Sequence, residues 1–256
     1  MTTTITKLVS IPTGINVGVT NAKQATMLGL LGNPRNNYDS LCREVTNPTL
    51  KGLIELASVG PFRVQGLRPA VASLKEILSE IRATQADVHA TLGSAGMLCA
   101  RLVRGTTTNA ISNHSWGSAI DLTLDGVLDT RGDNLVQEGL TRIAPVFNRH
   151  GWFWGAGFGT EDAMHFEAGD GLIKKWHANG EFGATPAPMP DAVLMQGDRG
   201  PEVLALQQRL NKRGADLKED GVFGVGTRAE VMAFQGANGL RPDGVVDPKT
   251  RAALGL

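Results

Sequence analysis

Three side chains in the middle of the chain, His114, Asp121 and His165, are of the types that hold a catalytic divalent metal ion. Two imidazoles and one carboxylate suit a borderline-soft ion, and three protein ligands leave a fourth position for water. Asp162 lies three residues before His165. A carboxylate beside a metal site can take a proton from the metal-bound water. A lone histidine or aspartate is more often exposed or hydrogen-bonded, so residue types alone leave both interpretations open.

The local sequence around these residues favours a close approach. His114 lies in a polar segment that contains Gly117, and a residue without a Cβ lets the chain fold back tightly. Residues 121–126 alternate in polarity and end in Asp-Gly, which predicts a strand running into a turn. The glycine-rich stretch 155–160 gives a flexible approach to Asp162 and His165. A loop histidine and a strand aspartate are therefore expected to lie together.

The order of these residues is more specific than their types. The pattern S-x-H-x-x-G-x-A-x-D at 112–121, followed by D-x-x-H at 162–165, resembles the signature of a zinc peptidase family. That family comprises D-Ala-D-Ala carboxypeptidases, D-Ala-D-Ala dipeptidases and L-alanyl-D-glutamate endopeptidases, many of the last being phage endolysins. The fixed positions of the first motif are all present, namely Ser112, His114, Gly117, Ala119 and Asp121.

The resemblance implies roles for the motif residues. His114, Asp121 and His165 are expected to bind Zn2+, with Asp162 as the general base. Family members use either Asp or Glu as the base, so the adjacent Glu161 stays an alternative.

Residues beside the motifs are expected to support the site. Glu167 is expected to orient a ligand rather than to bind the metal. The family also places an arginine upstream, aimed at the substrate carbonyl or carboxylate. Arg101 and Arg104 both qualify, and Arg101 is preferred as the catalytic arginine; the alternative for either is a solvated strand residue.

The elements that position these residues predict an α+β catalytic domain over residues 1–182, with a mainly antiparallel sheet. Residues 88–104 predict a strand, a turn at 93–96 and a second strand that carries Arg101. Helices are predicted from the apolar spacing and from the capping residues; they begin at Asn47-Pro48 and near Pro69, and extend over about 134–149 and 171–179.

The composition changes at 183–190, where three prolines at alternate positions predict an extended linker. The following module, 191–256, repeats D-G-V-x-x-x-x-T-R-A at 220–229 and 243–252. Each Asp-Gly predicts a turn before a helix, and Thr227 with Glu230 predicts a capping box. These features predict a small all-α bundle of three helices. The module resembles the peptidoglycan-binding domain of cell-wall hydrolases over about 197–254.

Composition excludes several classes of protein. The 25 basic and 25 acidic residues give zero formal charge, so the basic surface needed for non-specific nucleic-acid binding is absent. No segment approaches the roughly 18 consecutive apolar residues of a membrane-spanning helix. Cys42 and Cys99 match no zinc-ribbon or C-x-x-C spacing, and whether they pair stays open. The N-terminus has no charged segment followed by an apolar run, so we expect synthesis in the host cytoplasm without a signal peptide.

Together, the two halves predict a zinc-dependent peptidoglycan peptidase of the endolysin type, a monomer that acts on the bacterial cell wall in the periplasm or outside the cell. Its partner is bacterial peptidoglycan, with no nucleic acid and no membrane insertion. An endopeptidase is favoured over a D,D-carboxypeptidase, because a wall-binding tail suits a polymer. The bond, L-Ala–D-Glu or a cross-link, stays open. The alternatives are a wall-binding protein with an inactive peptidase half and a zinc amidase.

Overall fold

The structure is a computed structural model that describes residues 4–39, 41–104, 110–183 and 193–256. The strands are β1 (Leu8–Ser10), β2 (Ile54–Ser58), β3 (Arg63–Leu67), β4 (Leu92–Gly96), β5 (Ala119–Leu124), β6 (Leu135–Gln137), β7 (Trp152–Trp154) and β8 (His165–Ala168). The α-helices are α1 (Gln24–Leu31), α2 (Pro48–Leu53), α3 (Arg68–Thr84), α4 (Ala86–His89), α5 (Glu138–Arg149), α6 (Asp170–Ala178), α7 (Pro201–Asn211), α8 (Val225–Ala237) and α9 (Pro248–Leu254). Short 3-10 turns are η1 (Thr4–Thr6), η2 (Asn113–Trp116) and η3 (Gly155–Gly157).

Every sheet in the described residues is antiparallel, which confirms the predicted α+β class. The central sheet has four strands in the order β4-β5-β8-β7, and two-stranded ribbons pair β1 with β6 and β2 with β3. The main hydrophobic core includes α3, α5 and the apolar side of the central sheet. Trp152 and Trp154 are fully buried, so both serve the core.

Helix α3 has the predicted apolar face, with Val71, Leu74, Leu78 and Ile81 all buried. Helix α2 has the predicted cap, because the Asn47 side chain accepts hydrogen bonds from the backbone of Thr49 and Leu50.

Two local predictions are wrong at their boundaries. Residues 93–96, predicted as a turn, belong to β4, which pairs with β5 from Leu92 to Gly96 with an irregularity after Ser94. The chain then leaves the sheet, so Arg101 lies outside any named strand. Residues 135–137, predicted as helix, form β6 because β1 is available as a partner, and α5 begins at Glu138. In both cases pairing with a distant strand overrides the local pattern.

The described residues 193–256 contain α7, α8 and α9 around a second hydrophobic cluster that includes Val203, Leu206 and Phe223. The predicted capping box is wrong, since α8 begins at Val225 with Gly224 as its N-cap and no side-chain cap bond.

The repeated threonines have another role. The buried Gln207 amide donates to the Asp220 carboxylate, the Val222 carbonyl and the Thr227 hydroxyl, and Gln207 accepts from the Gly221 N–H. In the second repeat the buried Gln235 makes the same set of bonds, to Asp243, Val245, Thr250 and Gly244. The sequence repeat is therefore a structural repeat that is held by a buried glutamine.

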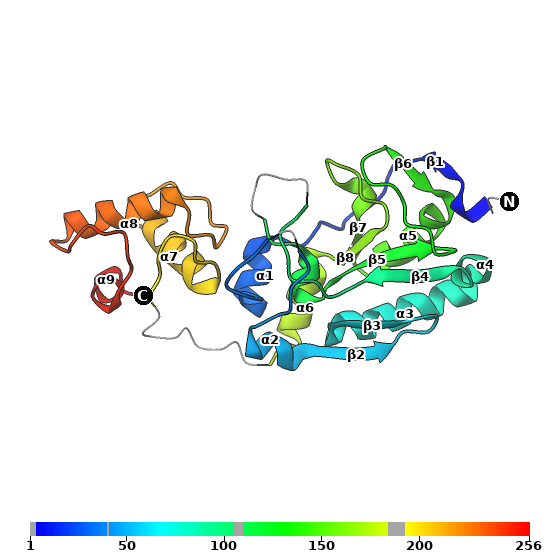
Figure 1. The fold of residues 1–256 in the computed structure, drawn as a ribbon, viewed down its shortest axis with the longest axis horizontal. Coiled ribbons are helices and arrows are strands. Elements are labelled where there is room, and N and C mark those ends of the chain that lie inside the picture. The colour runs from blue at the N-terminus through cyan, green and yellow to red at the C-terminus, as the bar shows by residue number, and fades with distance from the viewer. Residues whose placement is uncertain (1–3, 40, 105–109, 184–192) are drawn as a thin grey trace.

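Helix α1 of the N-terminal part contacts α7 of the C-terminal part (Figure 1). The Gln24 amide donates to the Asp220 carbonyl at 2.9 Å, and the Asn33 amide donates to the Arg199 carbonyl at 3.0 Å. Of the predicted linker 183–190, all but Gly183 lies outside the described residues. Across the described ranges, no helix has the length and apolar character that a membrane crossing needs.

Candidate metal centre

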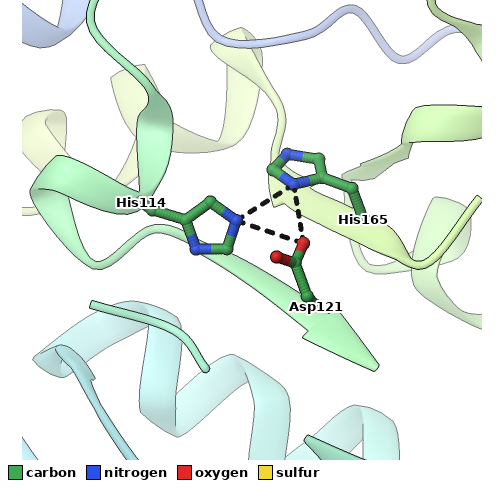
Figure 2. Close-up of side chains that lie close together, drawn as sticks. All are labelled: His114, Asp121 and His165. Carbon is green, nitrogen blue, oxygen red and sulfur yellow. Dashed lines mark hydrogen bonds and ion pairs between the residues drawn. The ribbon is translucent and has the colours of Figure 1, made fainter. Parts of the chain in front are cut away.

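His114, Asp121 and His165 converge on one point, as Figure 2 shows. His114 Nε2 lies 3.1 Å from Asp121 Oδ1 and 3.1 Å from His165 Nδ1, and His165 Nδ1 lies 3.1 Å from Asp121 Oδ1. The three donor atoms thus form an equilateral triangle. The arrangement expected from sequence, a loop histidine beside a strand aspartate and a distant histidine, is present in the structure.

The size of this triangle fits a small tetrahedral ion. Bonds of about 2.0–2.1 Å at tetrahedral angles separate neighbouring ligand atoms by about 3.3 Å, close to the separations found here. Two imidazole nitrogens and one carboxylate oxygen are also the donors that such an ion prefers. These residues could therefore hold a divalent metal and leave a coordination position free for another group.

The register of the central sheet places two of the candidate ligands. Asp121 in β5 lies directly opposite His165, the first residue of β8. Side chains of directly opposed residues project from the same face of a sheet, about 5 Å apart at their Cβ atoms. Ile120, Leu122 and Leu124 occupy the other face of β5 and are fully buried in the core. Asp121 and His165 are therefore neighbours through strand pairing and not through sequence proximity.

The third candidate ligand, His114, reaches the site through a tight turn. His114 lies in η2, which ends at Gly117 with φ of 66°. A Cβ on Gly117 would lie 2.8 Å from the Leu67 nitrogen and 2.9 Å from Gly66 Cα, closer than real contacts allow. Glycine is thus required both by its backbone conformation and by the close approach of β3.

The ring orientation of His114 is fixed by the backbone. His114 Nδ1 lies 3.0 Å from the Met97 carbonyl oxygen, which can only accept. The Nδ1 atom therefore carries the proton, and the unprotonated Nε2 faces Asp121 and His165.

His165 is oriented in the same way by a carboxylate. Its Nε2 lies 2.9 Å from Glu167 Oε2, so Nε2–H donates and Nδ1 is free to bind a metal. The other Glu167 oxygen accepts from the Ala22 N–H at 2.9 Å, and Glu167 is only 3% exposed. The contact expected between Glu167 and a ligand is present.

The segment that supplies the Met97 carbonyl is held on both sides. Cys42 and Cys99 form a disulfide, a pairing that the sequence left open. Beside it, Arg43 and Ala100 exchange backbone hydrogen bonds. On the other side, the Cys99 N–H donates to the His114 carbonyl. The disulfide therefore anchors the segment that positions His114, one of the candidate ligands.

The two candidate bases lie in different surroundings. Glu161 is 2% exposed, and its carboxylate accepts from the backbone N–H groups of Gly132, Asn134 and Ala163. Both of its oxygens therefore accept hydrogen bonds from backbone N–H groups and stabilise the loop. The Asp162 side chain is 23% exposed and lies 3.4 Å from the Arg131 guanidinium. Burial raises the pKa of Asp162 above its ordinary value, although the charges of His165 and Arg131 act in the opposite direction.

Arg101 interacts electrostatically with the candidate metal centre. Burial lowers the pKa of Arg101, whereas the charges of Asp121 and Asp162 raise it, so its guanidinium lies within range of both carboxylates. Its backbone is tied to η2, because the Arg101 N–H donates to the Ser115 hydroxyl and the Arg101 carbonyl accepts from the Ser112 N–H.

The charges of the cluster are strongly coupled. Burial opposes ionisation of Asp121, but His114 and His165 outweigh it and hold the pKa of Asp121 far below its ordinary value. Burial lowers the pKa of His165, but hydrogen bonds to Asp121 and Glu167 outweigh it and raise the pKa to about 10. Without a metal the cluster therefore retains a proton at neutral pH, in the place that a cation would take.

Sequence reasoning missed Met97, Ser115 and Arg131. Met97 acts through its carbonyl, which orients the His114 ring, and Ser115 acts through its hydroxyl, which accepts from the Arg101 backbone N–H. Neither residue belongs to the ligand pattern. Arg131 lies in a segment after β5 with no recognisable motif, and its guanidinium also donates to the Arg104 carbonyl. The only sign of Arg131 in the sequence is that it is a basic residue within a polar segment typical of a turn.

Comparison with known proteins supports both halves of the chain. Residues 105–168, which contain the three candidate ligands, match the family model described as D-alanyl-D-alanine carboxypeptidase. Residues 199–254 match the model of a peptidoglycan binding domain. The resemblances predicted from sequence are thus confirmed for these two segments.

Individual relatives match over shorter lengths. An uncharacterized protein from the bpoA1 3' region of Kitasatospora aureofaciens is 44% identical over 68 residues, which cover 25% of this chain and 56% of the relative. A peptidoglycan-binding protein from Clostridioides difficile, solved with glutamine hydroxamate, shares 36% identity over 26% of this chain and 42% of its own, with a TM-score of 0.26. The Burkholderia AP3 phage endolysin shares 46% identity over 25% of this chain and 24% of its own, with a TM-score of 0.24. The matched segment spans about half the length of this curated relative.

Proposed function

We propose that this chain is a zinc-dependent peptidase that hydrolyses a peptide bond in bacterial peptidoglycan, as phage endolysins do. The observation that carries the proposal is the triangle of donor atoms from His114, Asp121 and His165, with sides of 3.1 Å, inside the segment that matches a peptidase family. We assign Zn2+ to these three residues because two imidazoles and a carboxylate are common ligands of catalytic zinc.

Zinc in this position supplies Lewis-acid activation of a water molecule and of the scissile carbonyl. The protein's own contribution begins with Asp162, whose carboxylate accepts a proton from the attacking water and returns it to the leaving amine. The raised pKa of Asp162 suits this role, since a base with a pKa nearer neutrality both takes and gives a proton readily. We assign the base to Asp162 because the oxygens of Glu161 are occupied by backbone donors.

Two arginines complete the proposed machinery. Arg101, whose charge reaches Asp121 and Asp162, stabilises the negative charge that develops on the carbonyl oxygen. Arg131 is a positioning residue, because its guanidinium contacts Asp162 at 3.4 Å and holds the carboxylate in place.

The C-terminal part, residues 191–256, is proposed to be a wall-binding bundle of three helices that is joined through the linker 183–190 to the catalytic domain 1–182. Its match to a peptidoglycan binding domain supports this role. Nine acidic and nine basic side chains balance, so recognition does not rest on overall charge. Tethering to an insoluble polymer raises the effective concentration of the enzyme at its substrate by factors that can reach about 10² to 10⁴.

The tethering argument favours an endopeptidase over a D,D-carboxypeptidase, because wall attachment serves cleavage within a polymer. The chain then acts as a monomer on the cell wall after synthesis in the host cytoplasm. A wall-binding protein without catalysis is the second candidate, and the complete ligand triangle argues against it.

Digestion of purified peptidoglycan, followed by mass spectrometry of the fragments, tests the proposal. The zinc-loaded protein is expected to release peptides with new amino and carboxyl ends, and chelation or His114→Ala is expected to abolish release. Fragments freed at the sugar–peptide amide would indicate an amidase. Wall binding without any fragment, at full zinc occupancy, would establish the binding protein instead.

A further inference from the structure

Helix α1 contacts both α7 of the C-terminal part (Figure 1) and η2, the turn that carries His114. The Trp116 indole of η2 donates to the Gly32 carbonyl at 2.8 Å, and the Asn113 amide donates to the Ala22 carbonyl at 3.3 Å. A helix of eight residues is marginally stable by itself in water. The position of α1 therefore depends on the groups that pack against its two sides.

The face of the C-terminal part that contacts α1 is apolar and closely packed. Leu204 of α7 is only 9% exposed, yet it belongs to neither of the two hydrophobic clusters of the described residues. It lies against Gly29 of α1, where an added Cβ would be 3.8 Å from Leu204 Cδ2. Gly221 is buried against Leu28, because an added Cβ would be 2.5 Å from Leu28 Cδ1. Contact with α1 therefore helps to bury Leu204.

The second repeat has the same turn in different surroundings. Gly221 and Gly244 both have positive φ, of 67° and 73°, and each donates its N–H to a buried glutamine. A Cβ on Gly244 would meet Arg228 and Met232 of α8, within the C-terminal part. The turn at 220–221 therefore has two roles, since it closes its own repeat and also contacts α1.

Gln24 joins this turn to the N-terminal part of the chain. Its Nε2 donates to the Asp220 carbonyl at 2.9 Å, and its Oε1 accepts from the Ile111 N–H at 2.7 Å. The orientation of the amide is fixed, because a backbone carbonyl can only accept and a backbone N–H can only donate. One side chain therefore bonds the C-terminal part and residue 111 at the same time.

Ile111 lies beside the segment that carries Arg101, the arginine proposed to stabilise the developing charge. Ile111 pairs with Leu102 in an antiparallel bridge, and the neighbouring Ser112 N–H donates to the Arg101 carbonyl. Ile111 is also only 4% exposed, so it has little freedom to move alone. A displacement of Ile111 therefore displaces the backbone of Arg101.

We propose that the C-terminal part docks in one position on α1, through Leu204 and the turn at 220–221. Gln24 transmits this docking to the segment that carries Arg101 and is thus a positioning residue for the reaction. The C-terminal part then acts on catalysis as well as on attachment to the wall. The docking is independent of the proposed function, whereas its effect on the reaction rests on that function through the role given to Arg101.

Small-angle X-ray scattering of the full-length protein tests the docking. Leu204→Asp places a charge against α1, and Gly29→Asp places one on the α1 side of the same contact. Each is expected to raise the radius of gyration at unchanged helical circular dichroism, because a charge disfavours an apolar contact. Val225→Asp is the matched control, since this α8 side chain is 73% exposed and its replacement should leave the radius unchanged. Equal radii for all three variants would overturn the docking.

Amide hydrogen exchange in the same variants tests the coupling. Loss of docking is expected to speed exchange at the Ile111 and Ser112 N–H groups by about two- to tenfold, the range for one intramolecular hydrogen bond. Gln24→Met, which removes both hydrogen bonds but keeps the length of the side chain, is expected to do the same. Unchanged exchange at Ile111 in an undocked Leu204→Asp protein would overturn the coupling, whatever the rate in Gln24→Met.

Hydrolysis of a soluble muropeptide by the zinc-loaded protein tests the effect on the reaction. Gln24→Met is expected to lower kcat by about two- to tenfold with little change in KM, because Arg101 acts on the transition state. This loss should disappear in an Arg101→Gln background, where hydrolysis stays measurable because one such donor is worth about 10²- to 10³-fold.

A loss of kcat that persists without Arg101 would give Gln24 a general structural role and overturn its assignment as a positioning residue. Scattering and exchange need no substrate. A protein that hydrolyses nothing would therefore remove the proposed function, while these two measurements still decide the docking and its coupling to Ile111.

Discussion

Replacing Glu167 with glutamine is expected to weaken metal binding without touching a ligand. Both Glu167 oxygens are used: Oε2 accepts from His165 and Oε1 accepts from the Ala22 N–H. Glutamine has one acceptor oxygen, so its NH2 group must face one of two donors in a site where only 3% of the residue is exposed. His165 therefore loses either its ring orientation or the basicity that the carboxylate confers.

Loss of such a supporting carboxylate lowers metal affinity by about 10- to 100-fold, which corresponds to about 1.4–2.7 kcal/mol. Competition of the metal-free protein with a chromophoric zinc chelator at neutral pH measures this change directly. Asp170→Asn is the matched control. Asp170 is a similarly buried carboxylate that accepts from the neighbouring Lys23 N–H but does not contact a ligand, so its replacement disturbs the same segment without the effect on zinc. A Glu167→Gln protein whose zinc Kd equals that of Asp170→Asn would refute the reasoning.

Three further outcomes are expected. Asp162→Ala should keep stoichiometric zinc but lose peptidoglycan hydrolysis by several orders of magnitude. Glu161→Ala should instead lower the thermal unfolding midpoint, because three backbone N–H groups lose their acceptor. A zinc-loaded, stable and inactive Glu161→Ala protein would reverse the assignment of the base. Zinc affinity should rise as pH rises, by about tenfold per unit between about pH 6 and 8, because the raised pKa of His165 leaves a proton that zinc must displace; a Kd that does not vary over this range would contradict the assigned cluster charge. A chain that ends at Gly183 should cleave soluble muropeptides but bind intact walls poorly in a sedimentation assay, and unchanged wall binding would remove the proposed role of residues 191–256.

The sequence was most informative where a motif is short and its spacing fixed. His114, Gly117 and Asp121 lie within one loop and one strand, so their relation follows from local chain geometry. It was least informative at 88–104 and 134–149, where β4 and β6 form because distant partners offer a ladder. Hydrophobic spacing records which residues are buried, as in α3, but it does not record which strand lies alongside.

The C-terminal repeat illustrates the same distinction within a small module. The recurring Asp-Gly and threonine positions were visible in the sequence, and they predicted turns correctly, with φ of 67° at Gly221 and 73° at Gly244. The role of the threonines was not visible, because it depends on Gln207 and Gln235, which belong to the preceding helices and reach across to the turn.

The amino-acid sequence by itself determined the types of the candidate metal-binding residues, their order and the resemblance of two separate segments to two families, since these are properties of composition and spacing. Tertiary structure alone decided that Asp121 and His165 are cross-strand neighbours, that Met97 sets the tautomer of His114, and that Cys42 reaches Cys99. The physical reason is that each of these contacts joins residues whose separation along the chain carries no periodic signal. Their proximity is fixed by strand register and by packing of the whole core.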